Sequence, residues 1–170
     1  MQQRQFRFAL FGSTYQPKSS VAVGDFLDCV ARRGGKVSIE KEYHRYLSLG
    51  SRLELSGVEV FEADCLDADF VVSMGGDGTL LKAANCVGAR ELPIIGVNTG
   101  RLGFLADTTA AEIENTVEAI FNNDFYIEEH AVIEATTAKK KITGSPFALN
   151  DIAVLKRDNA SMISITASIN

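Results

Sequence analysis

The chain has 170 residues, of which 46% are hydrophobic and 23% charged, and its formal net charge is −5. This composition is that of a globular protein, and the length allows one domain or one domain with part of a second. The acidic balance argues against a nucleic-acid-binding or membrane-surface protein, since either class usually carries a basic face. The three cysteines form no C-x-x-C pair, so neither a disulfide framework nor a zinc site is predicted. No apolar run has the length of a signal peptide core or a membrane span, and a cytoplasmic location is therefore expected.

The first two thirds of the chain alternate short apolar runs with amphipathic stretches, a pattern typical of an α/β fold. Val23, Phe26 and Val30 recur at helical spacing, and the glycines at 34 and 35 predict the end of that helix. The run 70–74 is almost continuously apolar, as expected for a buried parallel strand. The expected strands are residues 6–11, 58–61, 70–74 and 93–97, and the expected helices are residues 20–33, 42–49, 79–87 and 110–122.

The pattern changes after residue 124. Residues 126–137, 147–155 and 162–169 all predict strands, and no helix separates them. In the last of these, apolar and polar side chains alternate, which is typical of a half-buried antiparallel strand. The sequence thus predicts an α/β domain with an open, mostly parallel sheet over residues 1–124, followed at 125–170 by the beginning of an all-β domain. Because three strands with an open edge make a poor free-standing domain, we expect the chain to be truncated.

The strongest chemical signal follows the strand at 70–74. Gly75-Gly76-Asp77-Gly78-Thr79 places glycines where the backbone can approach phosphate oxygens, ahead of a helix whose N-terminal end attracts anions. A carboxylate in such a loop repels phosphate, so Asp77 suggests contact with ribose hydroxyls, proton removal from one of them, or help in holding a metal ion. The alternative is a tight turn with Thr79 capping the helix. The loop matches neither the G-x-G-x-x-G nor the Walker pattern.

Three motifs carry a family resemblance. Gly75–Thr79 resembles the loop shared by NAD kinases, diacylglycerol and sphingosine kinases, and phosphofructokinases. The second motif, Asn98-Thr99-Gly100-Arg101-Leu102-Gly103-Phe104-Leu105-Ala106-Asp107, resembles the NAD kinase signature and separates that family from lipid kinases. The third, Ala148-Leu149-Asn150-Asp151, resembles the Asn-Glu/Asp motif of NAD kinases. The resemblance covers essentially all 170 residues.

The resemblance implies transfer of the γ-phosphate of ATP to the 2′-hydroxyl of the adenosine ribose of NAD, with a divalent metal ion, usually Mg²⁺. It assigns Asp77 the role of general base. It places phosphate or dinucleotide contacts at Gly75, Gly76, Gly78, Thr79, Asn98 and Arg101, substrate contacts at Phe104, Asn150 and Asp151, and a ligand contact at Ser161. Lys82, about one helical turn beyond the loop, is a candidate phosphate ligand.

Ordinary structural roles compete with several of these assignments. Lys82 equally fits a solvated helix lysine, Arg101 a surface ion pair, Asn150-Asp151 a β-turn and Phe104 a core aromatic. Family members continue with a Gly/Ser/Thr-rich stretch that completes the NAD pocket and with strands that build a dimer or tetramer. Since neither is present, this fragment alone is expected to be inactive. The rival hypotheses are a lipid kinase with the same glycine loop and a non-catalytic nucleotide-binding module.

Overall fold

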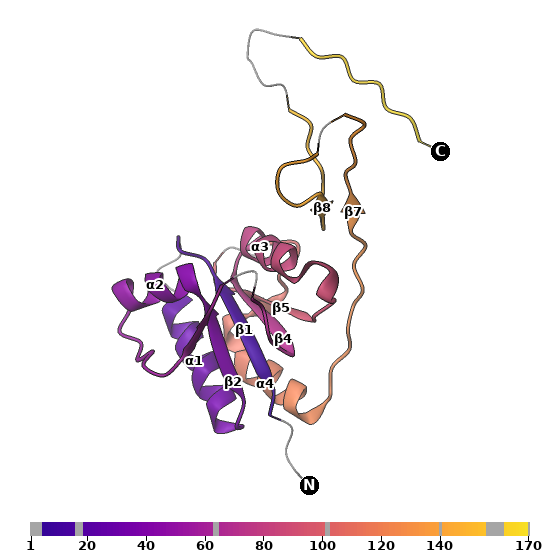
Figure 1. Ribbon diagram of the computed structural model, residues 1–170. Helices are drawn as coiled ribbons and strands as arrows, with labels where there is room; N and C mark the ends of the chain where they lie inside the picture. Colours follow the sequence, from indigo (N-terminus) through magenta and orange to yellow (C-terminus); the bar gives the residue numbers. More distant parts are fainter. Residues whose placement is uncertain are drawn as a thin grey trace. The chain divides into compact units, whose positions relative to one another are not determined.

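The computed structural model describes residues 5–15, 19–62, 65–100, 103–139, 141–155 and 162–169. The chain divides into two compact units, Met1–His130 and Ala131–Asn170 (Figure 1). This division falls after His130, somewhat beyond the boundary near residue 124 that the sequence suggested. We call the two parts unit 1 and unit 2.

Unit 1 is built on a six-stranded sheet with the order β3-β2-β1-β4-β5-β6, in which every pairing is parallel. Its strands are β1 (Arg7–Gly12), β2 (Lys36–Glu40), β3 (Glu59–Phe61), β4 (Phe70–Gly75), β5 (Ile94–Asn98) and β6 (Thr108–Thr109). The direction in which strands are added reverses between β1 and β4. In open α/β sheets this switch point is where ligands bind, at the carboxyl ends of the strands. The α/β class expected from the sequence is confirmed.

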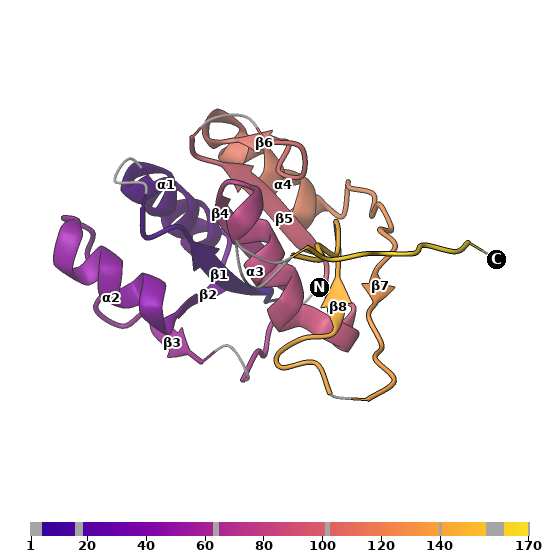
Figure 2. The same ribbon diagram turned by 90° about the horizontal axis from the view of Figure 1, so that it is seen from above.

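Helices cover both faces of the sheet. They are α1 (Ser19–Arg32), α2 (Lys41–Gly50), α3 (Asp77–Val87) and α4 (Ile113–Asn122), with short 3₁₀ turns at Gly88–Arg90 and Ala110–Glu112. The apolar sides of α1, α2 and α4 share one core cluster with β1, β4 and β5, and α3 packs on the opposite face through Ala83 and Val87. Figures 1 and 2 show α3 on the other side of the sheet from α1 and α4. All six residues of β4 are buried, as expected for a central parallel strand.

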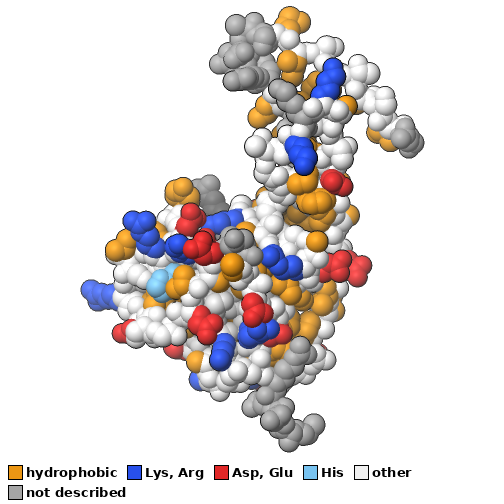
Figure 3. All heavy atoms as spheres, in the orientation of Figure 1, with side chains coloured by type: hydrophobic (Ala, Val, Ile, Leu, Met, Phe, Trp, Pro, Cys, Tyr) orange, Lys and Arg blue, Asp and Glu red, His pale blue; other side chains and the backbone are white. Residues whose placement is uncertain are grey.

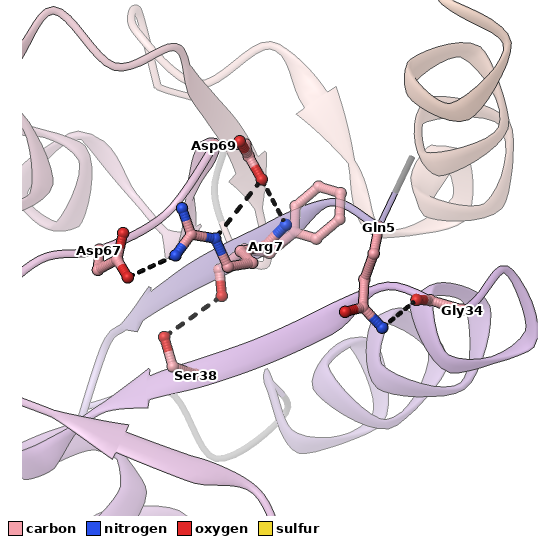
Figure 4. Close-up of polar contacts among 7 residues, drawn as sticks. Gln5, Arg7, Gly34, Ser38, Asp67 and Asp69 are labelled. Carbon is pink, nitrogen blue, oxygen red and sulfur yellow. Dashed lines mark hydrogen bonds and ion pairs between the residues drawn. The ribbon is translucent and has the colours of Figure 1, made fainter. Parts of the chain in front are cut away.

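The amino ends of the central strands are tied together by polar contacts (Figure 4). The backbone N–H of Arg7 donates to Oδ2 of Asp69 at 2.8 Å, and the Arg7 guanidinium forms an ion pair with Asp67. Gln5 donates through Nε2 to the carbonyl oxygen of Gly34 at 3.1 Å. These contacts lie at the start of β1, so they fasten the sheet at the end opposite the glycine loop.

Strand β2 was missing from the sequence prediction. Its pattern is short, Lys36-Val37-Ser38-Ile39-Glu40, and the glycines before it indicated only the end of a helix. In the structure Val37 and Ile39 pair with β1 in parallel register, and Ile39 is fully buried. A five-residue alternating segment becomes recognisable as a strand only when both its neighbours are known. Strand β6 was also missing from the prediction, because two residues carry no recognisable pattern.

The strands expected after residue 125 are confirmed in part: the first two regions contain short strands and the third does not. Unit 2 contains β7 (Ile133–Glu134) and β8 (Phe147–Ala148), paired antiparallel, and residues 162–169 form no strand. Apolar side chains there stay exposed, Ile165 by 62% and Leu155 by 85%, and Figure 3 shows such side chains on the surface. A strand exists only through hydrogen bonds to a partner, so an alternating pattern without a paired neighbour does not become one.

Candidate active site at the carboxyl edge of the sheet

The loops that follow β1, β4 and β5 meet at the switch point. The backbone N–H of Ser13, after β1, donates to the carbonyl oxygen of Met74 at 3.1 Å. The N–H of Thr99, after β5, donates to the carbonyl oxygen of Gly75 at 3.3 Å. The first two motifs, which are separate in the sequence, are therefore neighbours at one edge of the sheet.

The glycine loop turns β4 directly into α3. Gly76 is the N-cap residue, no side chain caps the helix, and α3 begins at Asp77. Thr79 therefore lies in the first helical turn, and the interpretation of Thr79 as the cap is wrong. A Cβ on Gly75 would lie 2.9 Å from Cβ of Thr79 and 3.2 Å from Cβ of Ser13, so only glycine fits there. The N–H of Thr79 donates to the carbonyl oxygen of Gly76 at 2.9 Å, so the anion-binding potential of this end belongs to the residues before Thr79.

The carboxylate of Asp77 is half-buried and is held by the second motif. The N–H of Phe104 donates to its Oδ2 and the N–H of Leu105 to its Oδ1, each at 3.0 Å. These two bonds, with a weaker one from Ala106, lower the pKa of Asp77 below the ordinary aspartate value, although burial acts in the opposite direction. Asp77 is thus ionised at neutral pH, and it points into the loop region rather than into packed core. A carboxylate has about four lone-pair sites, so it can still accept from a ligand.

The second motif presents one aromatic ring to solvent. The side chain of Phe104 is 102% exposed, so the alternative of a core aromatic is wrong. Asn98, at the end of β5, is 7% exposed, and its Oδ1 accepts from the N–H of Gly100 at 2.9 Å. Asn98 therefore shapes the start of this loop. Arg101 lies outside the described residues.

Lys82 points toward carboxylates. Its Nζ is 3.1 Å from Oε2 of Glu42 and 3.4 Å from Oε1 of Glu40, and its side chain is 41% exposed. Burial lowers the pKa of Lys82, but the hydrogen bonds and charges of Glu42 and Glu40 outweigh it and leave the pKa raised. Lys82 is therefore neither a simple solvated lysine nor, in this conformation, a cation open to phosphate.

Glu40 is the residue in this region that the sequence did not reveal. It ends β2, is only 5% exposed, and accepts from the N–H of Tyr43 at 3.0 Å, which caps α2. Because β2 and β4 flank β1, its contact with Lys82 spans the end of β1. The sequence carried one signal for a capping role, a glutamate just before the residues that predict a helix. The burial of this glutamate was not apparent, because β2 was not predicted.

The third motif lies in unit 2. Asn150 and Asp151 are exposed, and Asn150 lies in a bend beyond β8. Ser161 lies outside the described residues. Among the described residues no three His, Cys, Asp or Glu side chains gather as they would around a metal ion. Within the same ranges no helix is long and apolar enough to cross a membrane.

Comparison with known proteins identifies the family. The model of the ATP-NAD kinase N-terminal domain matches residues 33–125. The chain is 44% identical over 164 residues to an NAD kinase of Bacteroides fragilis and 31% identical over 164 residues to one of Porphyromonas gingivalis, covering 96% of this chain each time. It spans 57% and 56% of those relatives, somewhat over half their length.

The fold also matches a solved structure, yeast NADH kinase complexed with NADH. The TM-score is 0.70 at 17% sequence identity, over 86% of this chain and 47% of that one, so this likeness concerns the fold. The family model covers more than half of the chain, and its range includes the first two motifs of the site. The chain therefore belongs to the ATP-NAD kinase family.

Proposed function

We propose that the protein transfers the γ-phosphate of ATP to the 2′-hydroxyl of the adenosine ribose of NAD, giving NADP. The observation that carries this proposal is the ionised carboxylate of Asp77, fixed by Phe104 and Leu105 beside the start of α3. Family membership supports the substrates. A lipid as acceptor is not favoured, because the second motif belongs to NAD kinases.

In this proposal the glycine loop binds phosphate. Gly76 and Gly78 offer backbone amides at the uncapped end of α3, where the helix dipole favours negative charge, and Thr79 offers its hydroxyl. Gly75 allows the close packing of the loop that forms this helix start. Transfer of a phosphoryl group needs mainly positioning and charge stabilisation, so fixed amides suit it well.

Asp77 orients the acceptor and takes its proton. The 2′-hydroxyl oxygen forms a bond to the γ-phosphorus, the bond to the bridging oxygen of ADP breaks, and the hydroxyl proton passes to the carboxylate. A carboxylate with a lowered pKa is a weak base, so the proton moves late, when the new P–O bond has made the hydroxyl acidic. The loose transition state of phosphoryl transfer requires little earlier activation.

The remaining assignments stay predictions. Phe104 offers an exposed ring for stacking on a base, and Asn150 and Asp151 offer hydrogen-bonding groups for ribose hydroxyls or the amide. Phosphate would have to compete with Glu42 and Glu40 for Lys82. For Asn98, Arg101 and Ser161 we propose the ligand contacts implied by the resemblance. We also propose a cytoplasmic location and assembly as a dimer or tetramer.

We further propose that Mg²⁺ enters as part of the ATP complex. Mg²⁺ is usually bound through substrate phosphates and water, with one or two carboxylates at most. The described residues gather no larger set of ligands, so no step of the transfer is assigned to a protein-held ion.

The test is Asp77→Asn in the protein at its full natural length, with NADP formation from NAD and MgATP as the measurement. We expect kcat to fall by about 100-fold or more, with the KM for ATP nearly unchanged, because the proton acceptor is lost while the phosphate loop remains. Asp25→Asn, on the exposed side of α1, is the control and should behave as wild type. Full activity of the Asp77 variant would refute the role of Asp77 as proton acceptor, whereas no NADP formation by the wild-type protein would favour a non-catalytic nucleotide-binding module. Phosphorylation of diacylglycerol instead of NAD would support the lipid kinase.

A further inference from the structure

We propose that Gly103 is a positioning residue, whose missing side chain lets Asp77 hold the backbone of Phe104 so that carboxylate and aromatic ring act as one recognition unit. This inference deepens the proposed function and rests on it for the identity of the ligand. The unit would recognise a nucleoside whose base stacks on Phe104 while a hydroxyl of the adjoining ribose meets Asp77. When NAD is the acceptor and its 2′-hydroxyl reacts, that nucleoside is the adenosine half of NAD.

The contact between Gly103 and Asp77 is steric. A Cβ built on Gly103 would lie 2.6 Å from Cγ and 2.8 Å from Oδ2 of Asp77, well inside van der Waals contact. Gly103 is not among the glycines with a left-handed backbone, so its conformation would accept alanine. A side chain here would force the Asp77 carboxylate or the loop to shift, and either movement would disturb the contact between them.

This close approach allows two hydrogen bonds to Asp77 from the next two residues of the chain. The N–H groups of Phe104 and Leu105 reach different oxygens of Asp77 at 3.0 Å each, across 27 and 28 residues of chain. The causes that lower the pKa of Asp77 are backbone hydrogen bonds, and no charged side chain of the described residues is among them. The carboxylate is thus held by the loop itself, and whatever displaces the loop releases it.

The contact with Asp77 positions the backbone that carries the exposed ring of Phe104. Its side chain is completely exposed, so packing does not fix its position. Its own backbone N–H is bonded to the carboxylate, so the backbone from which the ring projects is held next to Asp77. Aromatic rings stack on nucleobases, so a ring held within reach of the carboxylate can anchor a base. A base on the ring brings the hydroxyl of its own ribose to Asp77.

The first experiment measures amide hydrogen exchange on peptides covering residues 103–107 in the protein at its full natural length. With Gly103→Ala, a Cβ displaces the loop, and the Phe104 and Leu105 amides should exchange about tenfold faster or more. Gly50→Ala is the matched control, since a Cβ there meets nothing within 4 Å, and it should exchange as wild type in this region. Unchanged exchange in the Gly103 variant would overturn the proposal. This measurement needs no substrate, so it separates failure of this inference from failure of the proposed function.

The second experiment measures NADP formation by the same variants. We expect Gly103→Ala to lower kcat/KM for NAD by about 100-fold while the KM for ATP changes less than about threefold, because the loop holds the acceptor and not the donor. Wild-type kcat/KM for NAD in a variant whose exchange is faster would also overturn the proposal.

Phe104→Leu keeps the backbone donor and removes only the aromatic face, which keeps the test decisive if the alanine variant does not fold. It should retain slow exchange and raise the KM for NAD by about tenfold, a loss of about 1.4 kcal/mol in binding. An unchanged KM for NAD would refute the role of the ring.

Discussion

The carboxylate of Asp77 accepts two backbone N–H groups and lies beside Gly103, which has no side chain to displace it. Gly75 has the same relation to Thr79 and Ser13. At this scale, the glycines of both motifs serve close packing between loops as well as an approach to phosphate. The sequence indicated the second use and could not show the first, because the partners are distant in the chain.

Ser73 provides a test of packing at the same scale. This residue of β4 is 1% exposed, and its hydroxyl has no hydrogen-bond partner among the described residues. Since an unsatisfied buried hydroxyl is unfavourable, Ser73→Ala should raise the free energy of unfolding by up to about 1 kcal/mol.

The measurement is urea denaturation followed by circular dichroism. The control is Ser51→Ala, whose hydroxyl donates to the carbonyl oxygen of Leu47 at 2.8 Å, and it should lower stability by about 1 kcal/mol. A loss of stability in the Ser73 variant as large as that in the control would show that its hydroxyl is hydrogen-bonded after all.

At the scale of elements, the end of β2 is coupled to the helix that carries the glycine loop. Glu40, the last residue of β2, caps α2 and contacts Lys82 of α3. The sequence predicted the two helices but not β2. A buried carboxylate needs a partner, so the Lys82 ammonium stabilises both helices where they meet the edge of the sheet. The alternation of strands and helices predicts these elements, whereas their mutual contacts follow only from the strand order.

Lys82→Met should therefore destabilise the fold more than the matched change Lys41→Met. Lys41 pairs with Glu62 at 2.7 Å, but both side chains are 64% exposed, and such surface pairs contribute little. For Lys82 we expect a loss of about 1 kcal/mol, reduced from the cost of a fully buried pair because its side chain is 41% exposed.

Urea denaturation of both variants at pH 7 measures this difference, and equal stabilities would contradict it. The pKa of Lys82 is raised in the folded protein, and this determines how its stabilising effect changes as the pH rises. The stabilisation is complete below the ordinary lysine pKa of 10.5 and is lost as the pH rises through the higher folded value. The difference between wild type and Lys82→Met should therefore shrink in strongly alkaline solution.

At the scale of the whole molecule, the two units differ in how much they bury. Unit 1 has a six-stranded parallel sheet with helices on both faces, whereas the described part of unit 2 has one two-residue strand pair and many exposed apolar side chains. The stability of the chain is therefore expected to reside in unit 1, with unit 2 opening locally at little free-energy cost.

Limited proteolysis of the 170-residue chain should cut first within residues 131–169 and leave a resistant fragment that contains α1 through α4. Proteases cleave where backbone is exposed and few hydrogen bonds hold it, which applies to the described residues after His130. Mass spectrometry of the early products is the measurement. Early cleavage inside the sheet of unit 1, for example within 70–98, would contradict this division of stability.

The sequence by itself determined the α/β class, the four α-helices and four of the strands of unit 1, and the motifs that led to the family. These features are local, because they are written in the spacing of apolar residues and in consecutive glycines and carboxylates. The tertiary structure alone decided that β2 is a strand, that Lys82 faces Glu40 and Glu42, that Phe104 is exposed and that residues 162–169 are not paired. Each of these depends on a partner far away in the chain, such as the 27 residues that separate Asp77 from Phe104. Residue spacing records which faces are buried, but it does not record which groups meet.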